Sequence, residues 1–348
     1  MIVRLPAFTV AGTLSSDARE DFLLVVQPNE PVDLAAALRL HSRWISEMLL
    51  AYGGILFRGF GVDSPSTMRR VAEAAYERAM PYTGGNLPRQ TVEKGVYTSD
   101  EISSQYRITP HYAMSYARTW PARLAFACVT PAKRGGRMPL CSGRRLMKHL
   151  HPKIVDEFER RRVSYVRMYA DGVGPATNQR QTWAQCYQTE SRTDVETFCR
   201  LNGIELEWLP SGGLRTRQTG HGVAPHPITG ERIFFNHAHL LHTSAWPTAE
   251  SDATRAAAIR QFLTTFPEEK AYYNVTFGDG GKMSVPVLDE VRRVIAEARV
   301  TFDWQRGDFL LLDNMLVLHG REEFSGDRLI LSAHGDPCSY KGAAPLCA

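Results

Sequence analysis

The sequence predicts a mainly β protein with inserted helices, an α+β chain built on a double-stranded β-helix, or jelly roll. Two observations predict it: many short apolar segments end at glycine turns, and fewer segments carry apolar residues at helical spacing. No linker-like stretch divides the 348 residues. We therefore expect a single domain, residues 1–348, with residues of about 145–300 inserted between core strands.

The first helices and strands are predicted from the spacing of their apolar residues and from the residues at which they start or end. Residues 32–53 place apolar side chains at helical spacing and finish at two glycines, which predicts a helix. The apolar run 55–58 stops at a glycine and predicts a buried strand. Ser64 or Ser66 can cap a helix through about residue 80. The polar, glycine-rich segment 81–104 is typical of a binding loop.

The middle of the chain alternates between strand and helix patterns. Small and apolar residues at 122–129 predict a strand, and 144–161 has the composition of a helix. Residues 163–169 then predict a strand and 193–201 a short helix. Residues 205–220 alternate between polar and apolar side chains, which is typical of a hairpin.

The last third of the chain predicts the strands that close the core. Residues 232–236 form an apolar strand pattern, and 252–266 and 289–298 have helical patterns. The apolar runs 309–313 and 329–333 each follow a Gly-Asp turn. These two runs predict closing strands of the jelly roll.

Composition and charge exclude several classes of function. The net charge is +4, from 41 basic and 37 acidic residues that are interspersed, so we expect no nucleic-acid partner. No apolar run reaches 18 residues, and the first residues lack a signal-peptide pattern, so we expect no membrane partner. The six cysteines form no CxxC pair. This predicts reduced thiols and a cytoplasmic location.

Several segments between residues 53 and 337 carry a family resemblance: GGILFRGFGV, GNLPRQTVEKGVYTSDEI, TPHYAMSYARTWPARLAF, GGRMPLCSGRR, FFNHAHLLHTS and RGDFLLLDNMLVLHGREEFSGDRLILSAHGDP. In their order and length they resemble the TauD/TfdA family of taurine dioxygenase-like Fe(II)- and 2-oxoglutarate-dependent oxygenases. The SyrP-like branch, known from amino-acid and natural-product tailoring, is the most similar. The resemblance implies a clavaminate synthase-like jelly roll.

The resemblance also implies a mononuclear iron site, in which two His and one carboxylate hold Fe(II). His111 and His319 match the two histidines. Ala113 stands where the family carries the carboxylate, so Fe(II) needs another third ligand. His237 or His239 can supply one. Alternatively, both lie on one face of a strand and line the substrate pocket by hydrogen bonding.

The anchors of 2-oxoglutarate also depart from the family pattern. The family holds the distal carboxylate with an Arg and a hydroxyl, because paired hydrogen bonds fix its angle. Met138 replaces the Thr, and Leu329 replaces the Arg. Arg328 is adjacent, but neighbouring residues of a strand point to opposite faces of the sheet. Arg328 can therefore bind the carboxylate only if a β-bulge or a one-residue shift in register turns its side chain toward the site. We therefore expect Fe(II) to be allowed and 2-oxoglutarate to be doubtful.

The resemblance implies an amino-acid-like substrate or a carrier-protein-tethered intermediate, and it allows a homo-oligomer.

Three classes of function stay open: an altered oxygenase, including a halogenase or a hydroxylase with a two-His site; a cofactor-independent enzyme; and a non-catalytic partner protein. In some oxygenases of this superfamily, a small residue at the carboxylate position makes room for chloride. The predicted substrate pocket comprises Ala113, Met138, Leu329, Asn86, Tyr97, His237, His239 and Arg321.

Overall fold

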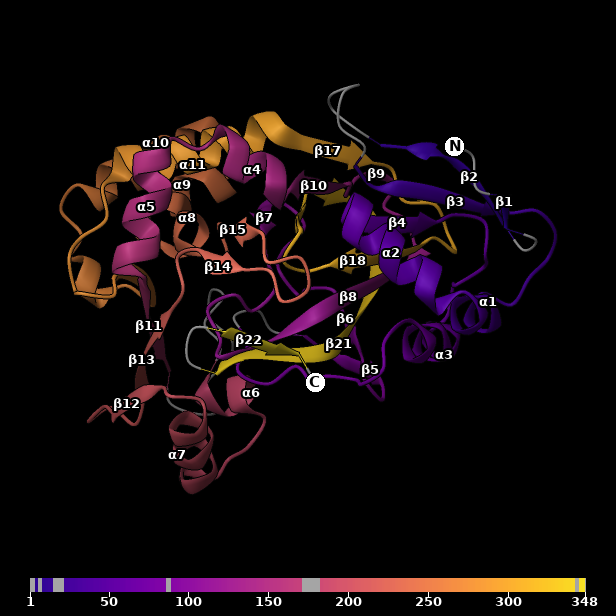
Figure 1. Cartoon of the computed structure of the whole chain (residues 1–348). Coiled ribbons are helices and arrows are strands. Elements are labelled where there is room, and N and C mark those ends of the chain that lie inside the picture. Colours follow the sequence, from indigo (N-terminus) through magenta and orange to yellow (C-terminus); the bar gives the residue numbers. More distant parts are fainter. Residues whose placement is uncertain are drawn as a thin grey trace.

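Two facing β-sheets form the jelly-roll core of the computed structural model, which describes residues 4–5, 8–14, 22–85, 89–170, 182–341 and 344–347 (Figure 1). The larger sheet has the order β1 (Arg4–Leu5), β2 (Phe8–Thr13), β3 (Leu24–Pro28), β4 (Gly54–Phe57), β18 (Phe309–Asp313), β8 (Thr119–Thr130), β21 (Leu329–Lys341), β6 (Val96–Thr98) and β5 (Thr91–Glu93), with β22 (Ala344–Cys347) also paired to β21. The smaller sheet has the order β17 (Arg299–Phe302), β10 (Met138–Ser142), β19 (Val317–Arg321) and β7 (Ile108–His111). The predicted fold class is confirmed.

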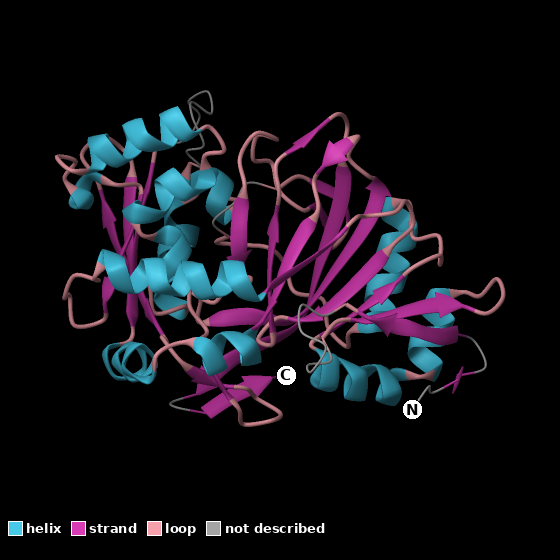
Figure 2. Cartoon of the chain, turned by 90° about the horizontal axis from the view of Figure 1, so that it is seen from above, coloured by secondary structure: helices cyan, strands magenta, loops and turns pink. Residues whose placement is uncertain are grey.

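The larger sheet is buried on both faces, which explains why its central strands are continuously apolar. One face packs into the space between the two sheets, where Phe126, Cys128 and Ile330 lie. Ala127 and Leu331 point to the other face. Helices α1 (Leu34–Leu40), α2 (Ser42–Tyr52) and α3 (Pro65–Ala75) cover that second face (Figure 2).

The helices of this layer begin at side-chain caps. Asp33 accepts from the backbone N–H of Ala35 at the start of α1, and Ser64 accepts from that of Thr67 at the start of α3. The helix predicted over 32–53 is divided at His41 into α1 and α2. The predicted end at the two glycines is confirmed for α2, because Gly53 caps this helix with a left-handed φ of 75°.

The segment of about 145–300 contains a third sheet, with the order β12 (Glu205–Trp208), β13 (Leu214–Gly220), β11 (Val163–Tyr169) and β16 (Tyr273–Phe277). Its helices gather beside this sheet at one end of the molecule (Figure 2): α4 (Gly143–His149), α5 (Pro152–Arg161), α6 (Trp183–Tyr187), α7 (Arg192–Leu201), α8 (Ala238–Leu241), α9 (Trp246–Ala249), α10 (Ala253–Leu263) and α11 (Val285–Ala298). Short 3-10 turns cover Thr243–Ala245 and Glu268–Lys270, and two-stranded pairs join β14 (Ala224–Pro225) to β15 (Arg232–Ile233) and β9 (Arg134–Gly135) to β20 (Phe324–Ser325).

Three further predictions need correction. The helix predicted over 144–161 is divided, because Pro152 starts a new helix. The strand predicted over 232–236 ends at Ile233, so the histidines that follow it lie at the start of α8 rather than on a strand. Cys338 is disulfide-bonded, which contradicts the prediction that all cysteines are reduced thiols.

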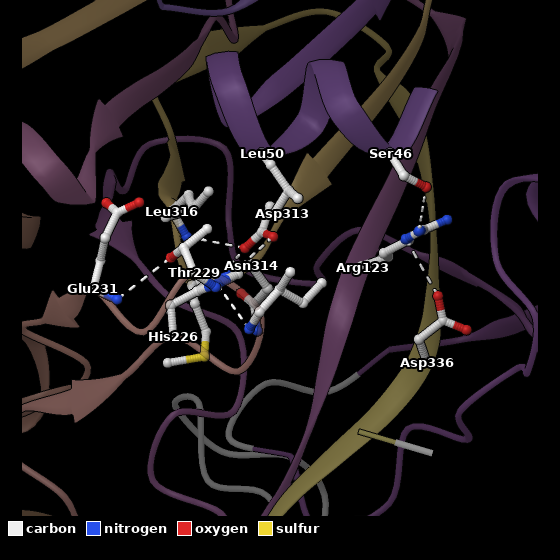
Figure 3. A network of polar contacts seen from close by, with 12 residues as sticks. Ser46, Leu50, Arg123, His226, Thr229, Glu231, Asp313, Asn314, Leu316 and Asp336 are labelled. Carbon is white, nitrogen blue, oxygen red and sulfur yellow. Dashed lines mark hydrogen bonds and ion pairs between the residues drawn. The ribbon is translucent and has the colours of Figure 1, made fainter. Parts of the chain in front are cut away.

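A buried polar network fixes the turn between β18 and β19 (Figure 3). Asp313 accepts from the backbone N–H groups of Met315 and Leu316 at 2.9 and 3.1 Å, and from His226 Nε2 at 3.1 Å. The other ring nitrogen of His226 accepts from backbone N–H groups, which sets its tautomer. This network therefore fixes the position at which β19 begins. Within the described ranges, no helix has the length and apolar character that crossing a membrane requires.

Candidate functional site

The two predicted histidines face each other across the smaller sheet. His111 on β7 and His319 on β19 are directly opposed in the antiparallel register, and their ring centroids are 4.7 Å apart. Opposed residues share one face of a sheet, and this face looks into the core. His111 Nδ1 donates to the carbonyl oxygen of Thr109 at 3.0 Å, which leaves Nε2 as the nitrogen that can accept or ligate.

Burial sets the charge of this pair. Desolvation, together with the positive charge of Arg89, lowers the pKa of His111 to about 4. Burial and the same arginine hold the pKa of His319 well below its usual value. Both rings are therefore neutral near pH 7, the form that ligates metals.

Ala113 lies buried beside the pair, and its backbone is held on both sides. Asn314 Oδ1 accepts from the N–H of Ala113 at 2.7 Å, and Asn314 Nδ2 donates to the carbonyl of Ala113 at 2.8 Å. The next residue, Met114, has a φ of 55° in the left-handed region. A methyl group thus occupies the position where the family carries a carboxylate, on a backbone that is fixed.

The two candidate third ligands differ in their surroundings. The ring centroid of His237 is 5.1 Å from that of His111, and its Nδ1 lies 2.6 Å from Ser115 Oγ. His239 Nε2 lies 2.9 Å from the carbonyl oxygen of Pro110, so this ring holds β7 next to His111. His237 therefore belongs beside the pair, while His239 supports the strand that carries it.

These residues do not complete a three-ligand iron site. Across the part of the chain that the structure describes, no three His, Cys, Asp or Glu side chains converge as a metal ion would require. Two imidazoles with an alanine in the third position offer only a partial set of ligands. Iron binding by His111 and His319 stays a prediction.

The predicted cosubstrate residues fall on two faces of the core. Met138 on β10 is buried on the inner face, since Leu140 two residues later is opposed to His319. Leu329 packs against the helix-covered face, so it does not line the pocket, and that prediction is corrected. The register of β21 shifts between Leu329 and Ile330. Arg328 points inward, where its Nε donates to the carbonyl of Gly136 at 3.3 Å.

The inward arginines are held by a buried carboxylate. Arg321 donates to Asp100 at 2.5 Å and to the backbone carbonyls of Ile102, Ser103 and Tyr106. It therefore orders the segment around Asp100, and its place in the substrate pocket stays a prediction. The guanidinium of Arg328 lies 4.0 Å from the same carboxylate.

Tyr97 on β6 is buried, and its hydroxyl accepts from the backbone N–H of Tyr82 at 3.3 Å. Its ring centroid lies 6.1 Å from that of His334, which is buried on the inner face of β21. Asn86, the remaining predicted pocket residue, lies outside the described residues.

Sequence reasoning missed Arg89 and Asp100, which act at the site from the same loop region. Arg89 Nη1 reaches Ser332 Oγ at 2.9 Å and His334 Nε2 at 3.1 Å. These partners are more than 240 residues away in the sequence. No local pattern marks such a contact; the polar, glycine-rich loop and the family-like segment GNLPRQTVEKGVYTSDEI contain both residues but give neither a role.

The most apolar recorded cavity lies next to this site. Its volume is about 310 Å³, and Met114, Tyr116 and Arg167 are among the residues that line it. Tyr116 separates this cavity from His237, with ring centroids 5.1 Å apart. The cavity therefore adjoins the histidines without containing them.

Comparisons with known proteins agree with this architecture. The family model described as "Taurine catabolism dioxygenase TauD, TfdA family" matches residues 20–334. The chain is 30% identical over 293 residues to the dapdiamide synthesis protein DdaC of Enterobacter agglomerans, covering 84% of this chain and 85% of the relative. It is 29% identical over 300 residues to a clavaminate synthase-like protein of Arabidopsis thaliana, covering 85% of each.

Among solved structures, PvcB of Pseudomonas aeruginosa superposes with a TM-score of 0.54 at 16% identity, over 97% of this chain and 94% of that one. Another structure of PvcB, described as an Fe, alpha-ketoglutarate dependent oxygenase from an isonitrile synthetic pathway, superposes with a TM-score of 0.52 at 16% identity, over 97% and 95% of the two chains. At such low identities these likenesses show the fold.

Proposed function

Because this chain belongs to the TauD/TfdA family, we propose that it is an altered member of that family whose substrate is an intermediate of natural-product biosynthesis. The substrate is an amino-acid-like molecule, free or tethered to a carrier protein. The protein does not run ordinary 2-oxoglutarate-dependent hydroxylation. Support for the substrate class comes from DdaC, which is named for dapdiamide synthesis. It is an argument by family analogy.

One observation carries the altered chemistry: Ala113 stands beside His111 and His319, where the family supplies its carboxylate. Asn314 holds the backbone of Ala113 at both its N–H and its carbonyl, so the alanine cannot turn away to admit a neighbouring side chain. Two neutral imidazoles bind iron more weakly than a complete facial triad.

The test restores the missing ligand with Ala113→Asp. We expect the wild type to bind Fe(II) weakly and to release no succinate from 2-oxoglutarate. The variant should bind Fe(II) about a hundredfold more tightly or better, because even outer groups around a metal contribute about 10–100-fold. Ala117→Asp is the control, since Ala117 lines the neighbouring cavity instead of the histidine pair. Micromolar 2-oxoglutarate binding with Fe(II)-dependent succinate release by the wild type would overturn the proposal.

A halogenase is the second candidate, because the structure adds an observation in its favour. Arg328 points into the core, so an arginine that can meet a 2-oxo acid is present although Leu329 is not one. Ala113 is the small residue that some oxygenases of this superfamily carry where a halide takes the place of the carboxylate. Succinate release that requires added chloride would favour this candidate. If neither Fe(II) nor 2-oxoglutarate binds, a cofactor-independent enzyme or a non-catalytic partner protein is favoured instead.

A further inference from the structure

Arg89 is a cation inside the site; it lies in the segment GNLPRQTVEKGVYTSDEI but matches no residue that the family uses for iron or 2-oxoglutarate. It enters from the loop before β5 and meets the inner face of β21. Its Nη1 donates to Ser332 Oγ at 2.9 Å and to His334 Nε2 at 3.1 Å. Its guanidinium lies over the ring of Tyr82, 4.2 Å from the centroid. These contacts hold the side chain in one place.

The charge of Arg89 has no acidic partner among the described residues. Arg321 and Arg328, the other inward-facing arginines of this region, both lie near Asp100. Arg89 forms no ion pair there, and its Nε is buried without a hydrogen-bond partner. A buried donor without a partner destabilises the folded protein, and more so when it is charged. A carboxylate bound at this guanidinium would supply the missing acceptor.

The positive charge also lies close to the histidine pair. Arg89 contributes to the lowered pKa of His111, of His319 and of His334. Since arginine only donates, His334 Nε2 is the acceptor in their hydrogen bond and Nδ1 carries the proton. That Nδ1 is also buried without a partner. Each of these two hydrogen-bonded side chains therefore keeps one buried donor without an acceptor.

We propose that Arg89 is the carboxylate anchor of a small-molecule ligand held beside His111 and His319. Nη1 is engaged with β21, while Nε has no partner and Nη2 makes no recorded hydrogen bond in the described chain. Nε and Nη2 form the edge of a guanidinium that grips a carboxylate with two parallel hydrogen bonds. The carboxylate comes from the substrate or from a 2-oxo acid. The inference rests on the proposed function for the role of this pocket.

The competing arginines are already engaged. Nη1 and Nη2 of Arg321 bind Asp100 and three backbone carbonyls, so neither is available to a second carboxylate, although its Nε has no hydrogen-bond partner. Arg328 is shared between Asp100 and Gly136. Arg167 donates to the carbonyl of Gly84 and lies against Tyr116 and Tyr169. Arg321 and Arg328 each lie near the carboxylate of Asp100, whereas Arg89 has no acidic neighbour among the described residues, so its Nε–Nη2 edge is available to the carboxylate of a ligand.

The test measures binding of carboxylates to the full chain by calorimetry, without metal and without turnover. One arm uses 2-oxoglutarate, and the other uses a panel of free α-amino acids. We expect one arm to show binding that Arg89→Met weakens about tenfold or more, the loss typical of a charge-assisted pair. Arg89→Lys should restore part of it, since it keeps the charge without the paired geometry. The arm that responds identifies the source of the carboxylate.

Arg78→Met is the matched control, because Arg78 is exposed. A second measurement does not depend on the variants folding: the nitrogen–proton NMR signal of Arg89 Nε should shift when the binding probe is added to the wild type. Unchanged affinity in Arg89→Met, an unmoved Arg89 signal, or no binding of either probe class to the wild type would overturn the anchor. These readouts are independent of succinate release, so the proposed function can fail while the anchor stands.

Discussion

Asn314 holds Ala113 by both of its backbone polar groups, at 2.7 Å to the N–H and 2.8 Å to the carbonyl. A further bond from Asn314 reaches the carbonyl of Pro121 at 2.8 Å. Because Asn314 is the first residue of the turn fixed by Asp313, it connects the β18–β19 turn to the segment after His111. The backbone next to the histidine pair is thus held at both polar groups of Ala113, at the position where the family carries its carboxylate.

Asn314→Ala should lower the free energy of unfolding by about 2–5 kcal/mol, since it removes three buried hydrogen bonds to backbone groups. Urea unfolding measures the change. Asn202→Ala is the control, because Asn202 is partly exposed and caps only the end of α7 through the carbonyl of Phe198. A loss no larger than that of the control would show that water replaces Asn314 at the site.

Asp100→Asn should have two measurable effects, because the carboxylate of Asp100 serves two buried arginines. Breaking a buried ion pair from one side costs about 3–5 kcal/mol, so the free energy of unfolding should fall by that order. Arg328 loses its acidic neighbour at 4.0 Å, so affinity for 2-oxoglutarate should rise.

The control for this change is Glu323→Gln, which breaks the exposed pair with Arg107. Both of its side chains are more than a third exposed, and such pairs contribute about 0–1 kcal/mol. If Asp100→Asn is as mild as this control and leaves 2-oxoglutarate binding unchanged, Asp100 does not hold the two arginines as the distances indicate.

The sequence predicted the fold because its core strands are marked locally. Residues 163–169 were predicted as a strand and form β11 with the same bounds, and Phe309–Asp313 is β18. Local apolar runs between turns carry this information. The histidine pair was also predictable, since His111 and His319 stand in long, ordered segments of family likeness.

The rest depended on information that is absent from any local pattern. Leu329 was placed in the pocket by its position in a motif, but a register shift and the burial of the neighbouring strand decide which face it occupies. Arg89 contacts residues of β21 that are distant in the sequence. Such contacts follow from tertiary packing, which periodicity does not encode.

Gly320→Ala should separate the two histidines. A Cβ at Gly320 would lie 2.3 Å from the carbonyl oxygen of Ile108 and 3.0 Å from the nitrogen of Pro110, both in the backbone of β7. Backbone atoms cannot turn aside, so β7 must shift away from β19. We expect a loss of about 1–3 kcal/mol in the free energy of unfolding, typical of overpacking, and weaker binding of Fe(II).

Gly220→Ala is the matched control for this prediction, because its added Cβ would meet neighbours only at ordinary contact distances of 3.5 Å or more. Thermal unfolding of the two variants, together with Fe(II) titration, compares them directly. Equal stability and equal Fe(II) affinity in both variants would contradict the close approach of β7 and β19.

Acid should destabilise the protein through its buried histidines. Burial lowers the pKa of His111 to about 4 and that of His239 to about 3, below the usual value of 6.5 that the unfolded chain restores. Between these values the unfolded state binds more protons, so stability is full above pH 6.5 and falls as the pH drops toward 4. Each such histidine contributes a slope of about 1.4 kcal/mol per pH unit.

Urea unfolding across this pH range measures that slope. His111→Gln should make it shallower by about 1.4 kcal/mol per pH unit, because one buried ring no longer resists protonation. His149→Gln is the control, since the side chain of His149 is exposed on α4 and has no buried ring to charge. If the free energy of unfolding had the same pH slope in wild type and in His111→Gln, water would already reach the ring of His111 in the folded protein. Water would then also reach the sheet face that His111 and His319 share.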